Sequence, residues 1–315
     1  MDFDYDFYLN KYSDLRHFNK QDAYVHWINY GQKEGRICGT QKINDVTKVT
    51  IIIHMFLTEL FDEFLTYIKN VKNVFNNVTV IFTININSEF DIKIHKENPK
   101  FIVIKVENKG TDVHAFLECI KYMRKNNIEN DFILKMHTKI TNNPAENILE
   151  WRKDLIDPIT NYSSLCYLQY YFKTIKNIGY VGAQKCSLPK NYDLDFYQNI
   201  EGINYLCSHF PHLEKEWTDF IGGNMFWISN AVLEKYLTPE LIDYFTSRFS
   251  YGKPPCNLND KGIYVEYLCE RLFTGVFCYD RTNILVNNMN IEFNSKRGFY
   301  NPKIFNFYTP KNILI

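Results

Sequence analysis

The residues with the clearest chemical potential stand at the end of the segment DFILKMHTKIT (131–141), where an apolar run leads into Lys135, His137, Thr138 and Lys139. Because side chains alternate along an extended strand, the two lysines and the histidine share one face. A cationic strand tip suits an anion such as a diphosphate. A solvated strand end is the alternative interpretation, and both stay open on the pattern alone.

Carboxylates occur at two other places that are suited to chemistry. Asp112 follows Gly110 in the loop ENKGTDVHAF, where it either caps the next helix or holds a sugar hydroxyl or a metal. Glu266 and Glu270 lie one helical turn apart in VEYLCERLF, with Arg271 beside them. Paired carboxylates can act as a base or bind hydroxyls, whereas a charged surface helix is the simpler interpretation.

Two segments offer groups that could bind a ligand rather than react with it. The segment GGNMFW combines backbone that can approach a ligand closely, an amide and two flat rings; these are Gly222, Gly223, Asn224, Phe226 and Trp227. A turn into a buried strand is the alternative interpretation. In EWRKDL, Arg152 is either a phosphate clamp or a charge on a helix surface.

The elements that must position these residues are predicted by hydrophobic pattern. VTIIIHMF (49–56) is nearly continuous in apolar residues, as is typical of a strand covered on both faces. Further strands are predicted at 78–85, 101–108, 131–137 and 178–184, with helices at 58–68, 114–126, 146–159, 164–177 and 264–277. The order predicts an α/β, Rossmann-type, mostly parallel sheet flanked by helices. Ligands bind such sheets at the carboxyl ends of the strands.

The first 40 residues are predicted to form a separate module. DFYLNKYSDL and QDAYVHWINYGQKEGR each have the apolar spacing of a short helix, which together indicate a helical hairpin. The polar stretch GTQKINDVTK then serves as a linker. The domain boundaries expected are therefore 1–40 for the hairpin and 48–315 for the α/β domain.

Composition excludes several classes of protein. The 315 residues include 36 Lys+Arg and 36 Asp+Glu, so nothing draws the whole chain to nucleic acid or an anionic membrane. The eight cysteines form no C-x-x-C pair, which gives little support to a zinc site. The start is unlike a secretory signal and no apolar run reaches about 18 residues, so no transmembrane segment is expected. These features predict a cytoplasmic protein with reduced thiols.

Taken together, several of these segments resemble the rhamnan synthesis protein F family, bacterial polysaccharide glycosyltransferases whose domains resemble the GT-A fold. The order and spacing match in IIIHMF…ELFDEFLTYIKNV, VENKGTDVHAFLECI, FILKMHTKIT, EWRKDLI, GGNMFW and VEYLCERLF, over about residues 48–280. The N-terminal segment resembles a module found beside glycosyltransferase domains, including in giant viruses of amoebae. That likeness implies a viral protein, located in the host cytoplasm or the virion.

The resemblance assigns roles by position. The family's aspartate loop falls on Gly110, Asp112 and Val113, and its basic strand tip falls on Lys135, His137, Thr138 and Lys139. Its tryptophan-arginine pair falls on Trp151 and Arg152. Its glycine-aromatic strand falls on Gly223, Phe226 and Trp227, and its glutamate helix falls on Glu266, Glu270 and Arg271. The family usually has Arg where Thr111 stands, Gly-Pro at His114 and Ala115, and often His at Tyr267. These departures bear on the donor sugar more than on the reaction.

Many GT-A enzymes carry a metal-binding D-x-D motif where this chain has LKMHTK. Lysines and a histidine can neutralise a nucleotide diphosphate directly, which would reduce or replace the role of a metal. His137 and Asp112 are alternatively ligands of Mn²⁺ or Mg²⁺.

The leading hypothesis is a glycosyltransferase of the hexosyltransferase type. It would move a sugar, rhamnose or a related one, from a nucleoside diphosphate sugar to a hydroxyl of a glycan or glycoprotein. The reacting carboxylate would be Asp112, Glu266 or Glu270. The alternative is a non-catalytic glycan-binding or scaffold protein on the same fold. An NAD-dependent enzyme is disfavoured because no G-x-G-x-x-G follows the first strand.

Overall fold

A computed structural model describes most of the chain. The residues described are 3, 5–31, 34, 36, 38, 46–138, 148–191, 196–249, 265–287, 291–295 and 298–300. Lys139, one of the predicted site residues, lies outside this set.

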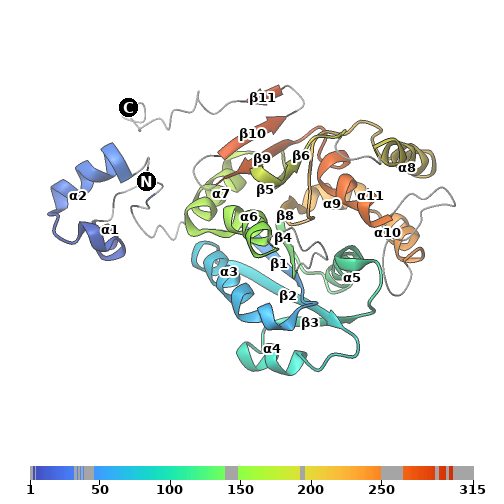
Figure 1. Cartoon of the computed structure of the whole chain (residues 1–315), viewed down its shortest axis with the longest axis horizontal. Helices are drawn as coiled ribbons and strands as arrows, with labels where there is room; N and C mark the ends of the chain where they lie inside the picture. Colours follow the sequence, from blue (N-terminus) through green and yellow to red (C-terminus); the bar gives the residue numbers. More distant parts are fainter. Residues whose placement is uncertain are drawn as a thin grey trace.

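A nine-stranded sheet forms the centre of the described structure, in the order β11-β10-β9-β5-β8-β4-β1-β2-β3 (Figure 1). Its strands are β1 (Lys48–His54), β2 (Asn77–Asn85), β3 (Ile102–Val106), β4 (Phe132–His137), β5 (Ile178–Ala183), β8 (Phe226–Ser229), β9 (Thr282–Val286), β10 (Ile291–Ser295) and β11 (Gly298–Tyr300). Strands β1 to β4 pair in parallel, as do β5 and β9. The predicted mostly parallel α/β sheet is therefore confirmed.

Strand β8 departs from the predicted pattern because it runs antiparallel between β4 and β5. The residues that precede β8 consequently lie beside the carboxyl end of β4, and Lys135 pairs with Phe226. A second, two-stranded sheet of β6 (Ser187–Leu188) and β7 (Phe220–Ile221) leads into this turn. The turn before β8 and the tip of β4 thus share one edge of the sheet.

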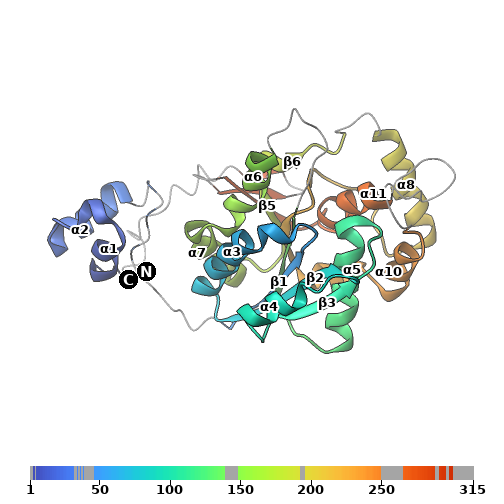
Figure 2. The same cartoon turned by 60° about the horizontal axis from the view of Figure 1, so that its bottom comes forward.

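Helices cover both faces of the sheet (Figures 1 and 2). On one face, α3 (Phe61–Val74), α6 (Ile148–Thr160) and α7 (Tyr162–Thr174) pack together. On the other, α5 (Thr111–Lys125) contacts α10 (Pro239–Thr246) and α11 (Val265–Arg271). The remaining described α-helices of this domain are α4 (Asp91–Glu97), α8 (Phe196–His209) and α9 (Asn230–Tyr236). No described helix is both long and apolar enough to span a membrane.

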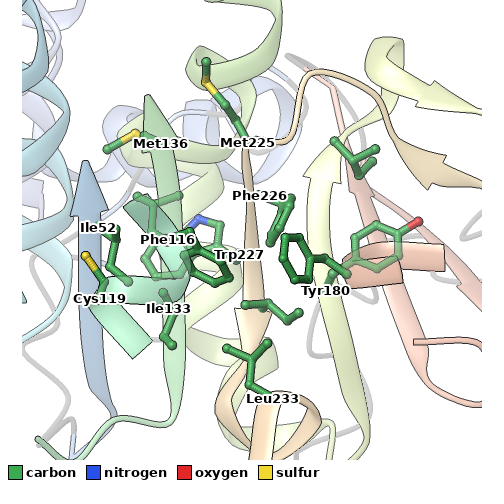
Figure 3. Packing of buried hydrophobic residues seen from close by; sticks show 14 of the residues in the cluster. Ile52, Phe116, Cys119, Ile133, Met136, Tyr180, Met225, Phe226, Trp227 and Leu233 are labelled. Carbon is green, nitrogen blue, oxygen red and sulfur yellow. The ribbon is translucent and has the colours of Figure 1, made fainter. Parts of the chain in front are cut away.

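Alternation along β4 and β8 decides which side chains face which layer. Phe132 stacks on Phe172 of α7, with ring centroids 3.7 Å apart. Leu134 lies on the same face of β4 as Phe132, and it pairs with Trp227 of β8. Lys135 and Phe226 point to the opposite face, toward α5. Figure 3 shows the core around these strands, with Trp227 and Phe226 on β8 beside Ile133 of β4 and Tyr180 of β5.

The N-terminal residues form two short helices, as predicted: α1 (Tyr5–Lys11) and α2 (Lys20–His26). They have a small core of their own around Tyr8, whose hydroxyl lies 3.0 Å from Nδ1 of His26. Lys11 reaches the α/β domain, where its Nζ lies 4.3 Å from the ring centroid of Tyr162. The hairpin is thus packed within itself and contacts α7.

Candidate functional site

Asp112 is placed by an unusual turn between β3 and α5. Gly110 and Thr111 have φ of 57° and 53°, both in the left-handed region. A Cβ at Gly110 would lie 2.4 Å from Cγ of Phe249, so only glycine fits there. The left-handed region costs a residue such as Thr111 about 1–2 kcal/mol. Backbone strain of this kind occurs often at functional sites, and here it lies beside a carboxylate.

A second left-handed turn faces the first one. Gly223 and Asn224 have φ of 85° and 58° immediately before β8. The φ of Gly223 strains any residue with a side chain, and an added Cβ would also lie 2.8 Å from Cδ1 of Leu155. Because β8 is antiparallel to β4, this turn brings Asn224 to the strand tip that carries Lys135.

These two turns and β4 meet in a polar cluster formed by Asp112, Lys135 and Asn224. Oδ2 of Asp112 accepts hydrogen bonds from Nζ of Lys135 at 2.5 Å and Nδ2 of Asn224 at 2.7 Å. Nζ of Lys135 also donates to the carbonyl oxygen of Asn224 at 2.8 Å. Lys135 is 1% exposed, whereas the side chain of Asp112 is 16% exposed. Desolvation lowers the pKa of Lys135, and the charge and hydrogen bond of Asp112 oppose that change.

His137 lies two residues after Lys135 on β4, so its side chain is on the same face of the sheet and joins the cluster. Its Nε2 lies 3.0 Å from the carbonyl oxygen of Gly223 and 3.9 Å from Oδ2 of Asp112. Since a carbonyl oxygen only accepts, Nε2 carries a hydrogen and donates it. His137 is buried, with 6% of its surface exposed.

His54 was not identified by sequence pattern, although it occupies a comparable place at the end of β1. It pairs with His137 in the β1–β4 register, and its Nδ1 lies 2.9 Å from Oγ1 of Thr83. Burial lowers the pKa of His54 to about 4, so the ring is neutral at pH 7. The available signal was a histidine directly after the isoleucine run of VTIIIHMF.

Thr138 links two strand ends. Its Oγ1 accepts hydrogen bonds from the backbone N–H groups of Phe56 and Leu57 at 2.8 and 2.9 Å. It therefore holds the loop after β1 against the tip of β4, and Phe56 is half exposed there. Contact of Thr138 with a ligand stays a prediction.

The glutamate helix, α11, reaches the same edge of the sheet through Glu270. Its Oε1 accepts a hydrogen bond from the backbone N–H of Gly223 at 2.6 Å. Glu266 is buried. Arg271 is also buried; it donates to the carbonyl oxygen of Tyr267 at 3.0 Å and lies over the ring of Phe220. Glu270 thus contacts the turn that holds Asn224.

Two residues predicted to bind a ligand are engaged elsewhere. Trp227 is fully buried, and its indole N–H donates to the carbonyl oxygen of Ile159 at 3.0 Å, so its ring presents no face to a ligand. Arg152 is also buried and donates to both carboxylate oxygens of Glu63, at 2.9 and 2.8 Å. Both contacts lie on the α6 side of the sheet, away from α5. The buried strand given as the alternative for Trp227 is what the structure shows, and ligand binding by either residue stays a prediction.

Gly222 has a structural role in the turn before β8. Its N–H donates to the carbonyl oxygen of Cys186 at 2.8 Å, and an added Cβ would lie 2.5 Å from Cδ1 of Leu188. The absence of a side chain at this position allows β6 and β7 to pack closely.

The two residues predicted as metal ligands each have one ligand atom engaged with a protein partner, and metal binding by them stays a prediction. Nε2 of His137 uses its hydrogen toward Gly223, and Oδ2 of Asp112 accepts from an ammonium group. No cluster of three or more His, Cys, Asp or Glu side chains able to hold a metal occurs among the residues that the structure describes.

A separate cavity lies at the opposite edge of the sheet, beside the start of β4. It measures about 350 Å³ and is lined by Ile120, Met123, Arg124, Asn127, Ile128, Glu129, Asn130, Asn230 and Glu234. Its residues come from the carboxyl end of α5, the loop between α5 and β4, and α9. It is therefore distinct from the cluster around Asp112.

A family model matches most of the chain. Residues 3–244 match the family described as Rhamnan synthesis protein F, whereas no curated protein matches significantly. The match begins before the predicted start near residue 48, so it includes the N-terminal helices, and it ends before Glu266 and Glu270. It contains Asp112, Lys135 and Asn224. Because the match covers most of the chain, this protein belongs to the rhamnan synthesis protein F family.

Proposed function

We propose that this protein is a glycosyltransferase that moves a sugar from a nucleoside diphosphate sugar to a hydroxyl of a glycan or glycoprotein. Membership of a family involved in rhamnan synthesis supports a role in building glycans, with rhamnose or a related sugar as the donor. The observation that carries the proposal is the Asp112 carboxylate, held by Lys135 and Asn224 at the carboxyl edge of a mostly parallel sheet. Sheets of this class bind ligands at that edge.

The chemistry requires a positioned carboxylate and positive charge. The bond from the anomeric carbon to the diphosphate breaks, and the diphosphate leaves with the electron pair. The acceptor oxygen bonds to that carbon, and its proton passes to a carboxylate base. Asp112 is the leading candidate for this base because Lys135 and Asn224 hold its carboxylate while 16% of its side chain stays exposed. Glu270, whose side chain is 20% exposed, and Glu266 are the alternatives. His137, Lys139 and Arg271 remain candidates for binding the diphosphate.

Asp112→Asn tests this role. With a panel of UDP-, GDP- and dTDP-sugars, the parent should slowly hydrolyse at least one donor, and the variant should do so at least tenfold more slowly because an amide cannot accept the proton. Released nucleotide is the measurement. Asp62→Asn is the matched control, because Asp62 is also the second residue of its helix but is exposed. If no donor is hydrolysed and none raises the melting temperature of the parent, the proposal fails.

A second candidate function is glycan binding without catalysis. The observation that favours it is that two protein donors already bind the same carboxylate oxygen of Asp112. This reading predicts binding of saccharides without binding of nucleotides. Calorimetric titration with UDP, dTDP and GDP separates the two, and tight binding of any of them eliminates the second.

A further inference from the structure

The ion pair of Lys135 and Asp112 differs from the usual exposed pairs of this protein. Lys135 lies on β4, buried to 1% exposure, with its Nζ 5.6 Å and 5.8 Å from the ring centroids of Phe116 and Phe226. Its ammonium donates to one carboxylate oxygen and one carbonyl oxygen. A buried ammonium so enclosed cannot be replaced by solvent cations without breaking both hydrogen bonds.

We propose that the Lys135 ammonium takes the place of a metal ion beside Asp112, so that donor binding and turnover need no divalent cation. The inference rests on the proposed function and deepens it. Lys135 is then a positioning residue: it holds Asp112 ionised and oriented, and does not itself contact the substrate.

The geometry around Oδ2 of Asp112 supports this substitution of an ammonium for a metal. A divalent cation bound to that oxygen would lie about 2.1 Å from it, and hence within about 4.6 Å of Nζ of Lys135. Two like charges at that separation repel strongly in a buried site. Oδ2 also accepts from Nδ2 of Asn224, so a metal there would displace two donors.

His137 gives an independent reason. Its Nε2, which lies 3.9 Å from Oδ2 of Asp112, donates a hydrogen to the carbonyl oxygen of Gly223. A metal ligand must offer a lone pair instead. Binding a metal between these side chains would leave the Gly223 carbonyl without this donor, at a turn whose left-handed backbone is already strained.

The first experiment uses the parent protein and needs no variant. UDP, GDP and dTDP are titrated by calorimetry in EDTA, in Mn²⁺ and in Mg²⁺. We expect the same affinity for the preferred nucleotide within about twofold in all three. Binding that requires Mn²⁺ or Mg²⁺ would overturn this inference and leave the glycosyltransferase proposal intact. An absence of nucleotide binding in every condition would instead remove the proposed function.

The second experiment removes the ammonium. Lys135→Met should slow donor hydrolysis by about tenfold to a hundredfold, the range for losing a hydrogen bond to a charged group. Lys105→Met on β3 is the matched control, since Lys105 forms a 3.2 Å pair with Asp91 but is 40% exposed, and it should match the parent. Lys135→Arg keeps the charge and should recover part of the rate.

The pH dependence of kcat/KM distinguishes a positioning role of Lys135 from a purely structural one. Lys135→Met removes a positive charge that favours the ionised form of the neighbouring carboxylate, so the acid limb of kcat/KM should move to higher pH in that variant. Among the residues that the structure describes, the other titratable groups around the pair include His54, Cys119, His137, Cys269 and Glu270. A Lys135→Met variant with the rate and pH profile of the parent would refute the proposal. If that variant does not fold, the cation titration of the parent decides.

Discussion

Replacing Trp227 with alanine should lower the free energy of unfolding by about 3–5 kcal/mol, the range for truncating a buried aromatic side chain. The indole is fully buried between the rings of Phe75 and Phe172, at centroid distances of 5.8 and 5.6 Å. Its removal also leaves the carbonyl oxygen of Ile159 without its donor. Urea denaturation followed by circular dichroism measures the loss.

The control for this prediction is Tyr170→Ala. Tyr170 is an aromatic residue of α7, the helix that also carries Phe172, but it is 56% exposed. Its replacement should change stability by no more than about 0.5 kcal/mol. If Trp227→Ala instead keeps the stability of the parent and loses nucleotide binding, the ring serves a ligand and not the core.

Replacing Arg152 with alanine should cost about 3 kcal/mol at pH 7. This value is the lower end of the range for breaking a buried ion pair, chosen because the Glu63 side chain is 26% exposed. The variant leaves a partly buried carboxylate without its bidentate partner. Lys48→Ala, which breaks an exposed pair with Glu129, should cost less than about 1 kcal/mol. Nucleotide affinity of a folded Arg152→Ala variant tests the separate prediction of a phosphate clamp.

The cost of Arg152→Ala should also depend on pH. Burial raises the pKa of Glu63, but the hydrogen bonds and charge of Arg152 outweigh it and hold the pKa below its ordinary value of 4.5. A carboxyl group with a lowered folded pKa stabilises the protein above its unfolded pKa, and this contribution is lost as pH falls through the folded value. The difference between parent and variant should therefore shrink below about pH 4.5. Urea denaturation at a series of pH values measures it; a constant difference would exclude the ion pair as its cause.

The strands of the first half could be predicted from the sequence because their signal is local. VTIIIHMF and DFILKMH are apolar runs of strand length, and the helices between them have regular apolar spacing. The antiparallel direction of β8 could not be predicted, because an apolar run such as Phe226–Ser229 pairs equally well either way. Its direction depends on which neighbours it meets late in the chain.

The candidate site could be predicted only as a set of residue types at strand ends. Sequence pattern placed Asp112, Lys135 and His137 at the ends of predicted strands, and the structure brings them together. Nothing in the sequence indicated that Lys135 would be buried. Alternation along a strand shows which side chains share a face of the sheet, but it does not show which helices cover that face. The bond from Gly223 to Glu270 depends on the position of α11, for which the sequence carries no local signal.

The contacts of the candidate site have a consequence for how the chain folds. They join residues far apart in sequence: 112 positions for Asp112 and Asn224, 89 for Lys135 and Asn224, and 86 for His137 and Gly223. Each closes a long loop whose entropy must be lost before the contact forms, which slows folding. A partly folded chain in which β1, β2 and β4 have paired would still lack the turn before β8. Ligand binding at this cluster would therefore report completion of the native topology, and not merely collapse of the core.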